Sequence, residues 1–384
     1  MRPGQDNTGE HPAVACGTPS SAQGLPRQGE GPNGQESLRK RILREGGSRR
    51  SRLTLLVLAI VLVAAAVASY SLGRFPVSPS ELMSYLYTTI TMQPPQISSE
   101  AASVITNIRF PRITAAILIG AALAIAGGSY QGVFRNPMVS PDILGASAGA
   151  GFGASLGILL GLPGIGVQLV AFLLGMGAVG ITYSISKVVG RRNSTTLVLV
   201  LAGMVVGAMF QAFVSIIKYI ADPFSQLPEI TFWLMGGLSA LEGGDLLMML
   251  APFAIGLVVL LSLRWRLNVL SFGDEEAAAL GVDTKRLRLV IIVAATLITS
   301  SAVSVAGQIG WVGLVIPHFS RMIVGPNYRY LLPASLIIGA IYLLLVDDIA
   351  RNLLTVEIPL GILTAVIGAP VFIFLLIKGK KGWA

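Results

Sequence analysis

Side chains able to perform covalent or metal chemistry are scarce in this sequence. It has a single cysteine, Cys16, and two histidines, His11 and His318. One thiol forms no disulfide within the chain, and two histidines leave no cluster of ligands for a metal. The phosphate-binding pattern Gly-x-x-x-x-Gly-Lys-Ser/Thr does not occur in the sequence. We therefore expect no catalytic residue, no metal site and no cofactor bound by this chain, and we do not expect an enzyme.

The most polar segment of the apolar part of the chain is 264–288, which lies between two long apolar runs, 246–263 and 289–307. Its basic ends indicate a cytoplasmic loop between two membrane spans. Helix-forming residues follow Gly273 and stop at Gly281. This pattern predicts a short surface helix with an acidic first turn, after which a second helical turn can begin.

Two interpretations of this loop follow from its pattern. Its apolar side chains could form a platform on which another protein docks; they are Leu270, Phe272, Leu280 and Val282. The same pattern also suits an amphipathic loop that lies on lipid headgroups. Periodicity alone does not separate these two interpretations.

The overall composition predicts an all-α, polytopic membrane protein. Hydrophobic residues make up 53% of the 384 residues, and charged residues make up only 12%. This balance is far from that of soluble globular proteins. The net charge of +9 comes from the N-terminal segment and from the ends of apolar runs. We therefore attribute the charge to membrane topology and expect no nucleic-acid partner.

The chain divides into a polar N-terminal segment and a membrane domain. Residues 1–52 are poor in apolar side chains and end in a basic cluster, which predicts a disordered cytoplasmic tail. Residues 53–384 form the expected transmembrane domain. Since the run 53–72 is longer than the core of a signal peptide, we expect a retained helix. About 20 apolar residues cross a bilayer, which predicts ten spans with both chain ends in the cytoplasm: 53–72, 113–134, 143–161, 166–186, 196–217, 246–263, 289–307, 309–324, 331–349 and 358–377.

Ionisable residues are nearly absent from the middle of these spans. Ion-coupled transporters usually keep such a residue there, because a charge at the bilayer centre is costly. We therefore expect the energy for transport to come from outside the membrane domain. An intramembrane enzyme would need polar catalytic groups clustered at one depth, which the spans lack. Glycine and alanine are dense in the second and third spans, which predicts closely packed helices.

Five segments resemble the FecCD-type permeases, the membrane subunits of ABC importers for iron-siderophores, haem and cobalamin. They are 109–112 (Arg-Phe-Pro-Arg), 131–149 with Asn136-Pro-Met138, the loop around 273–281, 313–318 ending in Pro-His, and 357–370. Together they cover nearly all of the chain from Arg109 to Lys378. The resemblance implies a type II ABC importer permease fold with ten helices in the inner membrane.

The resemblance also implies partners and a cargo. The partners are a second permease subunit, in a homodimer or a heterodimer, two ATPase subunits that bind ATP and Mg, and an external solute-binding protein. Membrane lipid surrounds the permease. The implied cargo is an iron chelate, either siderophore-bound iron or haem, with cobalamin as the alternative. A secondary transporter driven by an ion gradient is a less favoured alternative.

The resemblance places functional residues at matching positions. In the cytoplasmic loop, contacts that couple the permease to the ATPase are implied at Gly273, Glu275, Ala277, Leu280 and Gly281. Docking of the external binding protein is implied at Arg109, Arg112 and Arg351, where charge pairs would favour fast and oriented encounter. Arg109 and Arg112 are three residues apart, so we expect them on one helical face at the outer membrane boundary. Their alternative role is that of interfacial anchors.

A cytoplasmic gate is implied at Asn136, Met138 and Thr196, although Thr196 equally suits the N-cap of a helix. Three residues of the fifth span either line the route or pack within the bundle: Met204, Met209 and Phe213.

Two carboxylates lie close to Arg351 in the sequence. Asp347 precedes Arg351 by one helical turn, so the two can pair along one face. Asp348 departs from the family pattern, in which an apolar residue is usual. It either alters the docking surface or faces water.

Overall fold

The computed structural model describes residues 48–73, 75, 77–91, 93, 97–189, 195–239, 241 and 243–379, and these ranges contain helices and no strand. The longer helices are α2 (Ser48–Ser71), α5 (Phe110–Phe134), α6 (Ala146–Leu159), α7 (Gly164–Val189), α8 (Thr195–Ile220), α10 (Gly243–Leu270), α12 (Thr284–Ala306), α13 (Val312–Val324), α14 (Tyr328–Asn352) and α15 (Leu360–Gly379). The shorter elements are α3 (Pro79–Ile90), α4 (Ser99–Ser103), the π-helix η1 (Val104–Arg109), the 3₁₀ helix η2 (Pro141–Leu144), α9 (Gln226–Met235) and α11 (Asp274–Ala279).

Each span predicted from the sequence is a helix, which confirms the all-α membrane fold. Among the residues that the structure describes, seven helical segments are long and apolar enough to cross a bilayer. Shorter apolar helices in α6, α13 and α15 account for the remaining predicted spans.

The N-terminal boundary differs from the expectation. The expected tail, 1–52, lies outside the described residues as far as 47, but Ser48 already begins α2. Residues 48–52 are therefore helical rather than part of a disordered tail. Arginine favours helix, and this segment contains Arg49, Arg50 and Arg52. The helix therefore continues past the end of the apolar run.

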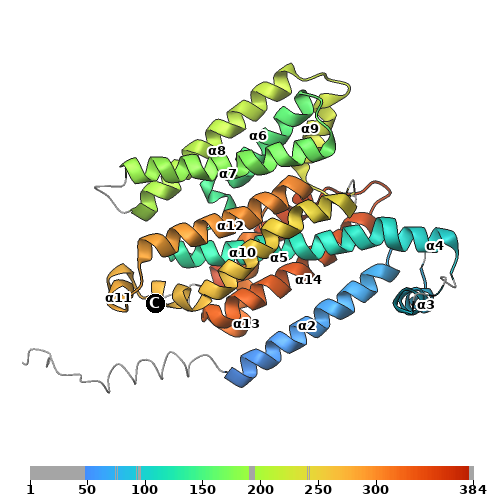
Figure 1. Cartoon of the computed structure of the whole chain (residues 1–384), viewed down its shortest axis with the longest axis horizontal. Helices are drawn as coiled ribbons and strands as arrows, with labels where there is room; N and C mark the ends of the chain where they lie inside the picture. Colours follow the sequence, from blue (N-terminus) through green and yellow to red (C-terminus); the bar gives the residue numbers. More distant parts are fainter. Residues whose placement is uncertain are drawn as a thin grey trace, which may run out of the picture. The chain divides into compact units, whose positions relative to one another are not determined.

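Helix α5 is the centre of the bundle, in contact with α10, α12, α13 and α14 (Figure 1). Small residues make these contacts possible. A Cβ atom on Gly120 would lie 2.2 Å from the backbone oxygen of Gly339, and one on Gly127 would lie 1.8 Å from that of Gly313. The helix backbones therefore touch directly, which confirms the close packing predicted from the glycine pattern.

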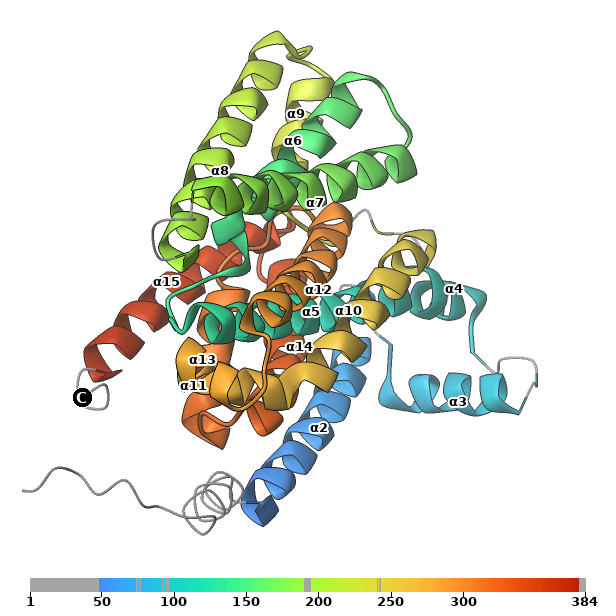
Figure 2. The ribbon, with the colours of Figure 1, turned by 60° about the vertical axis from the view of Figure 1, so that its left-hand side comes forward.

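Helices α6, α7 and α8 form a second group, which contacts the first through α12 (Figures 1 and 2). Glycine is again required, since a Cβ atom on Gly149 would lie 2.5 Å from the backbone oxygen of Leu174. Helix α9 packs against α6. Helix α2 lies outside both groups, and only 6% of its most apolar stretch is buried. Its main neighbour is α14.

The helices alternate in direction and so define two opposite faces. Helices α5, α7 and α10 end on the face that carries α11, Asp274–Ala279, and we call it the α11 face. Helices α2, α8 and α14 end on the face that carries α9, Gln226–Met235, and we call it the α9 face. Figures 1 and 2 place the beginning of α2 and the end of α15 toward the α11 face.

Candidate functional site

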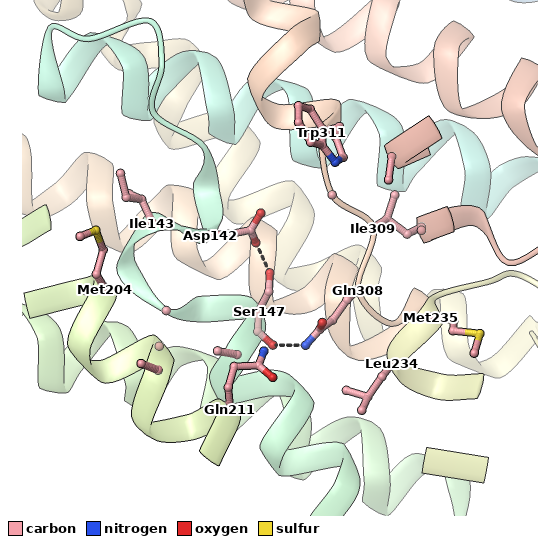
Figure 3. A pocket seen from close by; sticks show the side chains of 18 of the residues that line it. Asp142, Ile143, Ser147, Met204, Gln211, Leu234, Met235, Gln308, Ile309 and Trp311 are labelled. Atoms are coloured by element: carbon pink, nitrogen blue, oxygen red, sulfur yellow. Dashed lines mark hydrogen bonds between the residues drawn. The ribbon is translucent and has the colours of Figure 1, made fainter. Parts of the chain in front are cut away.

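A cavity of about 770 Å³ lies where the two helix groups meet (Figure 3). Its walls come from η2 and the start of α6, from α8, from the end of α9, from the connection 308–311 and from the start of α15. These segments are far apart in the sequence. The cavity therefore exists only in the folded bundle.

Backbone contacts hold three of these walls together. The nitrogen of Leu360, at the start of α15, donates a 2.9 Å hydrogen bond to the backbone oxygen of Gly236. A Cβ atom on Gly361 would lie 2.3 Å from the backbone oxygen of Met235 and 2.6 Å from that of Gln308. Gly236 also has a φ of 70°, a left-handed conformation that favours glycine. The end of α9, the 308–311 connection and α15 thus meet with no room for side chains between them.

Polar side chains lie together in the middle of the view of the cavity, with apolar residues on either side (Figure 3). Gln308 Nε2 donates a 3.0 Å hydrogen bond to the backbone oxygen of Ser147. Ser147 Oγ in turn donates to the carboxylate of Asp142. The side chain of Gln211 reaches the cavity from α8. These groups offer hydrogen bonds to a passing solute without a strong fixed site.

No lysine, arginine or histidine is among the described residues that line the cavity. The apolar lining includes Met204, Met235 and Trp311. A charged solute would therefore not be held by an opposite charge from a basic side chain. A mostly apolar cavity with a few polar groups is typical of a site that accommodates a small molecule.

Sequence reasoning identified only part of this lining. Met204 lines the cavity, as one of the alternatives for the fifth span proposed. Phe213 packs against Phe152, with ring centroids 5.4 Å apart, which supports the packing alternative. Gln211, Gln308 and Ser147 were missed. Gln211 could have been noticed in the sequence because it is a glutamine within an apolar run.

The helix predicted in the cytoplasmic loop is present as α11, and its side chains divide into two sets. Glu275 is exposed and Leu280 is 59% exposed, so both are available to a partner. Ala277 is fully buried. Its expected role as a coupling contact must therefore be corrected, because Ala277 packs the helix against the permease itself.

Glycines flank α11 as the sequence pattern predicted. Gly273 has a φ of 132° and Gly281 has a φ of 78°, and both values are strained for other residues. The two glycines therefore allow the chain to turn into and out of α11.

Asp274 connects α11 to the rest of the α11 face. Its carboxylate accepts a 2.6 Å hydrogen bond from Arg288 Nη2 at the start of α12. The same oxygen lies 3.8 Å from Arg135 Nη2, at the end of α5. Arg135 has a left-handed φ of 49° and begins the turn that follows α5. The ion pair between Asp274 and Arg135 therefore links the position of α11 to this turn.

Two of the expected gate residues lie in the turn after α5. The backbone nitrogen of Met138 donates a 2.9 Å hydrogen bond to Asn136 Oδ1, and Met138 is 45% exposed. Neither residue lines the 770 Å³ cavity. Thr196 is in the first turn of α8, and its side chain lies outside the described residues. The gate assignment therefore stays a prediction.

The three arginines expected to receive a binding protein are all buried near the α9 face. Arg112 pairs with two carboxylates, 2.9 Å from Asp347 and 2.9 Å from Glu357. The guanidinium of Arg109 donates to the backbone oxygens of Tyr70 and Phe75. The two side chains have different neighbours within the protein, so neither is openly exposed, and their role in docking stays a prediction.

The position of these arginines in the helix explains their burial. The helical segment extends over Ser99–Phe134, and the π-helix η1 joins α4 to α5. The predicted span, 113–134, began much later. Arg109 and Arg112 thus lie inside a continuous helix rather than at its tip.

Arg351 takes part in a second group of contacts, which fastens α2 to α14. Its Nη2 donates to the backbone oxygen of Ser69 at 2.8 Å and pairs with Asp348. Ser69 Oγ donates to Asp348 at 2.6 Å. Asp347 lies 3.9 Å from Arg351, which confirms that these two residues share a helical face. Asp348 is only 8% exposed, so it neither faces water nor forms an open docking surface.

The helical bundle, its largely apolar cavity and its surface helix define the class of this protein: a polytopic membrane permease. The chain belongs to the FecCD transport family, whose profile matches residues 58–378. It is therefore the permease component of an ABC importer.

Three relatives show the range of this family. The chain is 42% identical to the molybdate import system permease protein MolB of Haemophilus influenzae, over 85% of this chain and 95% of the relative. It is 36% identical to the Fe(3+)-citrate import system permease protein YfmE of Bacillus subtilis, over 85% and 96%. It is 34% identical to the hemin transport system permease protein HmuU of Yersinia pestis, over 87% and 98%.

The fold is also that of a solved permease. An ABC transporter assigned to the metal-chelate type, in an inward-facing conformation, superposes with a TM-score of 0.75. The two chains are 41% identical, and the match covers 85% of this chain and 99% of the other. The expected type II ABC importer permease fold is confirmed.

Proposed function

We propose that this FecCD permease imports a metal-containing solute through the 770 Å³ cavity. The observation that carries this proposal is the largely apolar cavity at the junction of α8, α9 and α15, which no basic side chain among the described residues lines. In the proposed complex, a second permease subunit completes the pathway. Separate ATPase subunits, with ATP and Mg, supply the energy at the α11 face, and a solute-binding protein delivers the cargo at the α9 face.

The distribution of charge supports this orientation. Basic residues gather at helix ends on the α11 face: Arg135, Lys187, Arg264, Arg266, Lys285, Arg286 and Arg329. Among the described residues, fewer basic side chains lie on or near the α9 face: Arg109, Arg112, Lys218 and Arg351. By the positive-inside rule the α11 face is cytoplasmic. Both chain ends then lie in the cytoplasm, and the permease is placed in the inner membrane.

The structure of α11 supports ATPase docking at this helix. Glu275, Leu280 and Phe272 form an exposed set on α11 and its flanks, and the flanking Gly273 and Gly281 fix the turns. A force applied to α11 reaches Arg135 and its turn through Asp274. This turn contains Asn136 and Met138, so the proposed gate lies one ion pair away from the proposed docking site.

Of the three buried arginines, only Arg112 contacts the binding protein directly in the proposed docking. Arg112 already holds Glu357, whose side chain is 36% exposed. An acidic group of the binding protein reaches Arg112 by taking the place of Glu357. Arg109 and Arg351 support the surface from inside rather than contacting the partner directly.

Two cargo classes fit different observations. The volume and the largely apolar, methionine-containing walls of the cavity favour a bulky metal chelate, such as siderophore-bound iron or haem, with cobalamin as a variant. The 42% identity to a molybdate import permease favours a compact metal oxyanion.

Uptake by the assembled importer in proteoliposomes separates these cargo classes. We expect ATP-dependent uptake of one class among iron-siderophore, haem, cobalamin and molybdate, and no uptake driven by an ion gradient alone. Uptake by the permease without ATPase under a proton or sodium gradient would contradict the proposal.

A matched pair of variants on α8 tests the pathway within the same experiment. Ala208 lines the cavity, whereas Val205 is 68% exposed and does not line it. Ala208→Trp should lower uptake at least ten-fold because the indole projects into the cavity and narrows it, while Val205→Trp should retain uptake. Equal rates for both variants would exclude this cavity as the route.

Glu275→Arg should weaken assembly with the ATPase at least ten-fold. A reversed charge at a docking surface costs about 1.4 kcal/mol or more, which is a factor of ten in affinity. The measurement is the dissociation constant of the purified permease and ATPase. Glu229→Arg, an exposed glutamate of α9 on the opposite face, is the matched control. Wild-type affinity for Glu275→Arg, or equal loss in both variants, would remove α11 as the docking helix.

A further inference from the structure

A second, smaller hollow lies beside α11, on the α11 face. It has a volume of about 420 Å³ and lies between the end of α10, the α11–α12 connection and the start of α12. We call it the α10–α12 groove. Its lining residues are Leu263, Trp265, Arg266, Leu280, Gly281, Val282, Asp283, Arg286, Leu287 and Val290.

We propose that the α10–α12 groove binds an anionic phospholipid, with the phosphate between Arg266 and Arg286 and an acyl chain along the exposed sides of α10 and α12. Both arginines line the groove and are exposed. Guanidinium groups bind phosphate oxygens through charge-assisted hydrogen bonds. The groove therefore combines two cationic groups with apolar lining residues.

The carboxylate in the groove does not cancel this charge. Asp283 Oδ2 lies 3.1 Å from Arg286 Nε. The side chain of Arg286 nevertheless remains 88% exposed. Its guanidinium is therefore open to a second anion, and Arg266 adds another positive charge. Asp283 is also the N-cap of α12, because its side chain accepts a 3.0 Å hydrogen bond from the Arg286 nitrogen, which accounts for its presence.

The apolar part of the groove indicates a lipid rather than free phosphate. Trp265 is 57% exposed and Val290 is 45% exposed, and both line the groove. Beyond it, exposed apolar residues continue along both helices: Ile255 and Val258 on α10, and Val293 on α12. An acyl chain would cover this strip, whereas free phosphate would leave it uncovered. Tryptophan favours the membrane interface, and basic pockets between helices on the cytoplasmic side suit anionic headgroups.

The location gives this lipid a role in the proposed mechanism. Leu280 and Gly281 lie at the end of α11 and also form part of the groove. A bound lipid would therefore brace α11 from the membrane side. This role rests on the proposed ATPase docking, but the binding site itself does not.

Trp265 provides a direct probe of occupancy. The chain has four tryptophans, so the difference between the wild type and Trp265→Phe isolates the emission of Trp265. In nanodiscs, brominated phosphatidylglycerol should quench this emission at least three-fold more strongly than brominated phosphatidylcholine at the same mole fraction. Arg266→Gln combined with Arg286→Gln should abolish the preference. Arg264→Gln combined with Lys285→Gln, an equal loss of charge at residues that do not line the groove, should retain it.

Three results would overturn the proposal. The first is equal quenching by the two brominated lipids. The second is loss of the preference in the control variant as well, which would indicate general attraction to a basic surface. The third is complete relief of quenching when ATPase subunits or millimolar inorganic phosphate are added, which would assign the groove to a protein interface or to a free anion. None of these readouts depends on cargo uptake, so failure of the proposed cargo leaves this test intact.

Discussion

Asp347→Ala is expected to lower the free energy of unfolding by about 3 kcal/mol, because removal of one partner from a buried ion pair leaves the other charge uncompensated. Asp347 is fully buried, lies 2.9 Å from Arg112 and 3.9 Å from Arg351, and so faces two positive charges. Glu357 and Asp348 keep one contact each with these arginines. We therefore expect a loss of unfolding free energy at the lower end of the range measured when buried ion pairs are broken.

The measurement is denaturant unfolding of the purified permease, followed by intrinsic fluorescence. The double variant Arg112→Met with Asp347→Leu is the control. Removing both charges at once leaves no buried unpaired ion, so this variant should be much closer to the wild type than Asp347→Ala is. If the single and double variants are equally unstable, the loss comes from packing and the electrostatic explanation fails.

Gly127→Ala is expected to cost about 2 to 3 kcal/mol, because overpacking at a tight helix contact forces the backbones apart. The new Cβ atom would lie 1.8 Å from the backbone oxygen of Gly313 and 2.7 Å from its Cα. Both are backbone atoms, so no side chain can rotate away to relieve the clash. Helix α5 must move relative to α13, and through α5 the rest of the bundle is disturbed.

Gly177→Ala in α7 is the matched control for this substitution. A Cβ atom at Gly177 would meet nothing within 4 Å. Alanine also favours helix over glycine by up to about 1 kcal/mol, so this variant should be as stable as the wild type or slightly more stable. Thermal unfolding in the same detergent compares the two. Equal stability of the two variants would show that α5 and α13 are not in backbone contact.

The spans could be predicted from the sequence because the bilayer dictates their length and polarity. A helix such as α10 must be long and apolar, and its basic end at Arg264 and Arg266 reports which side it reaches. The α11 helix was predicted for a similar reason, since its glycines lie at fixed positions next to a short run of helix formers. In both cases the signal is local in the sequence.

Contacts between distant segments could not be predicted in this way. Arg112 finds its carboxylates 235 and 245 residues further along the chain. The family motif gave the position of this arginine but not its partners, so a surface role was expected for a buried group. The burial of Ala277 was missed for a related reason. The helix was correct, but which side of it packs on the permease depends on α10 and α12.

The cavity lining is the clearest example of contacts that could not be predicted from the sequence. Gln308 and Ser147 belong to different segments, and Trp311 lies in a left-handed backbone conformation with a φ of 69°. No local pattern predicts that a non-glycine residue adopts this conformation. The lining of a pathway assembled from several segments therefore becomes visible only in three dimensions.

The outlying position of α2 has a consequence for biosynthesis. This helix leaves the ribosome before the rest of the bundle, yet two of the residues that fasten it, Asp348 and Arg351, belong to α14 and are made near the end of translation. Between these two moments α2 must persist in lipid without its principal neighbour. The mean hydropathy of 2.6 in this segment allows α2 to remain in the bilayer as a single helix. In a nascent chain that stops before Tyr328, Ser69 has neither of its hydrogen-bond partners, Asp348 and Arg351.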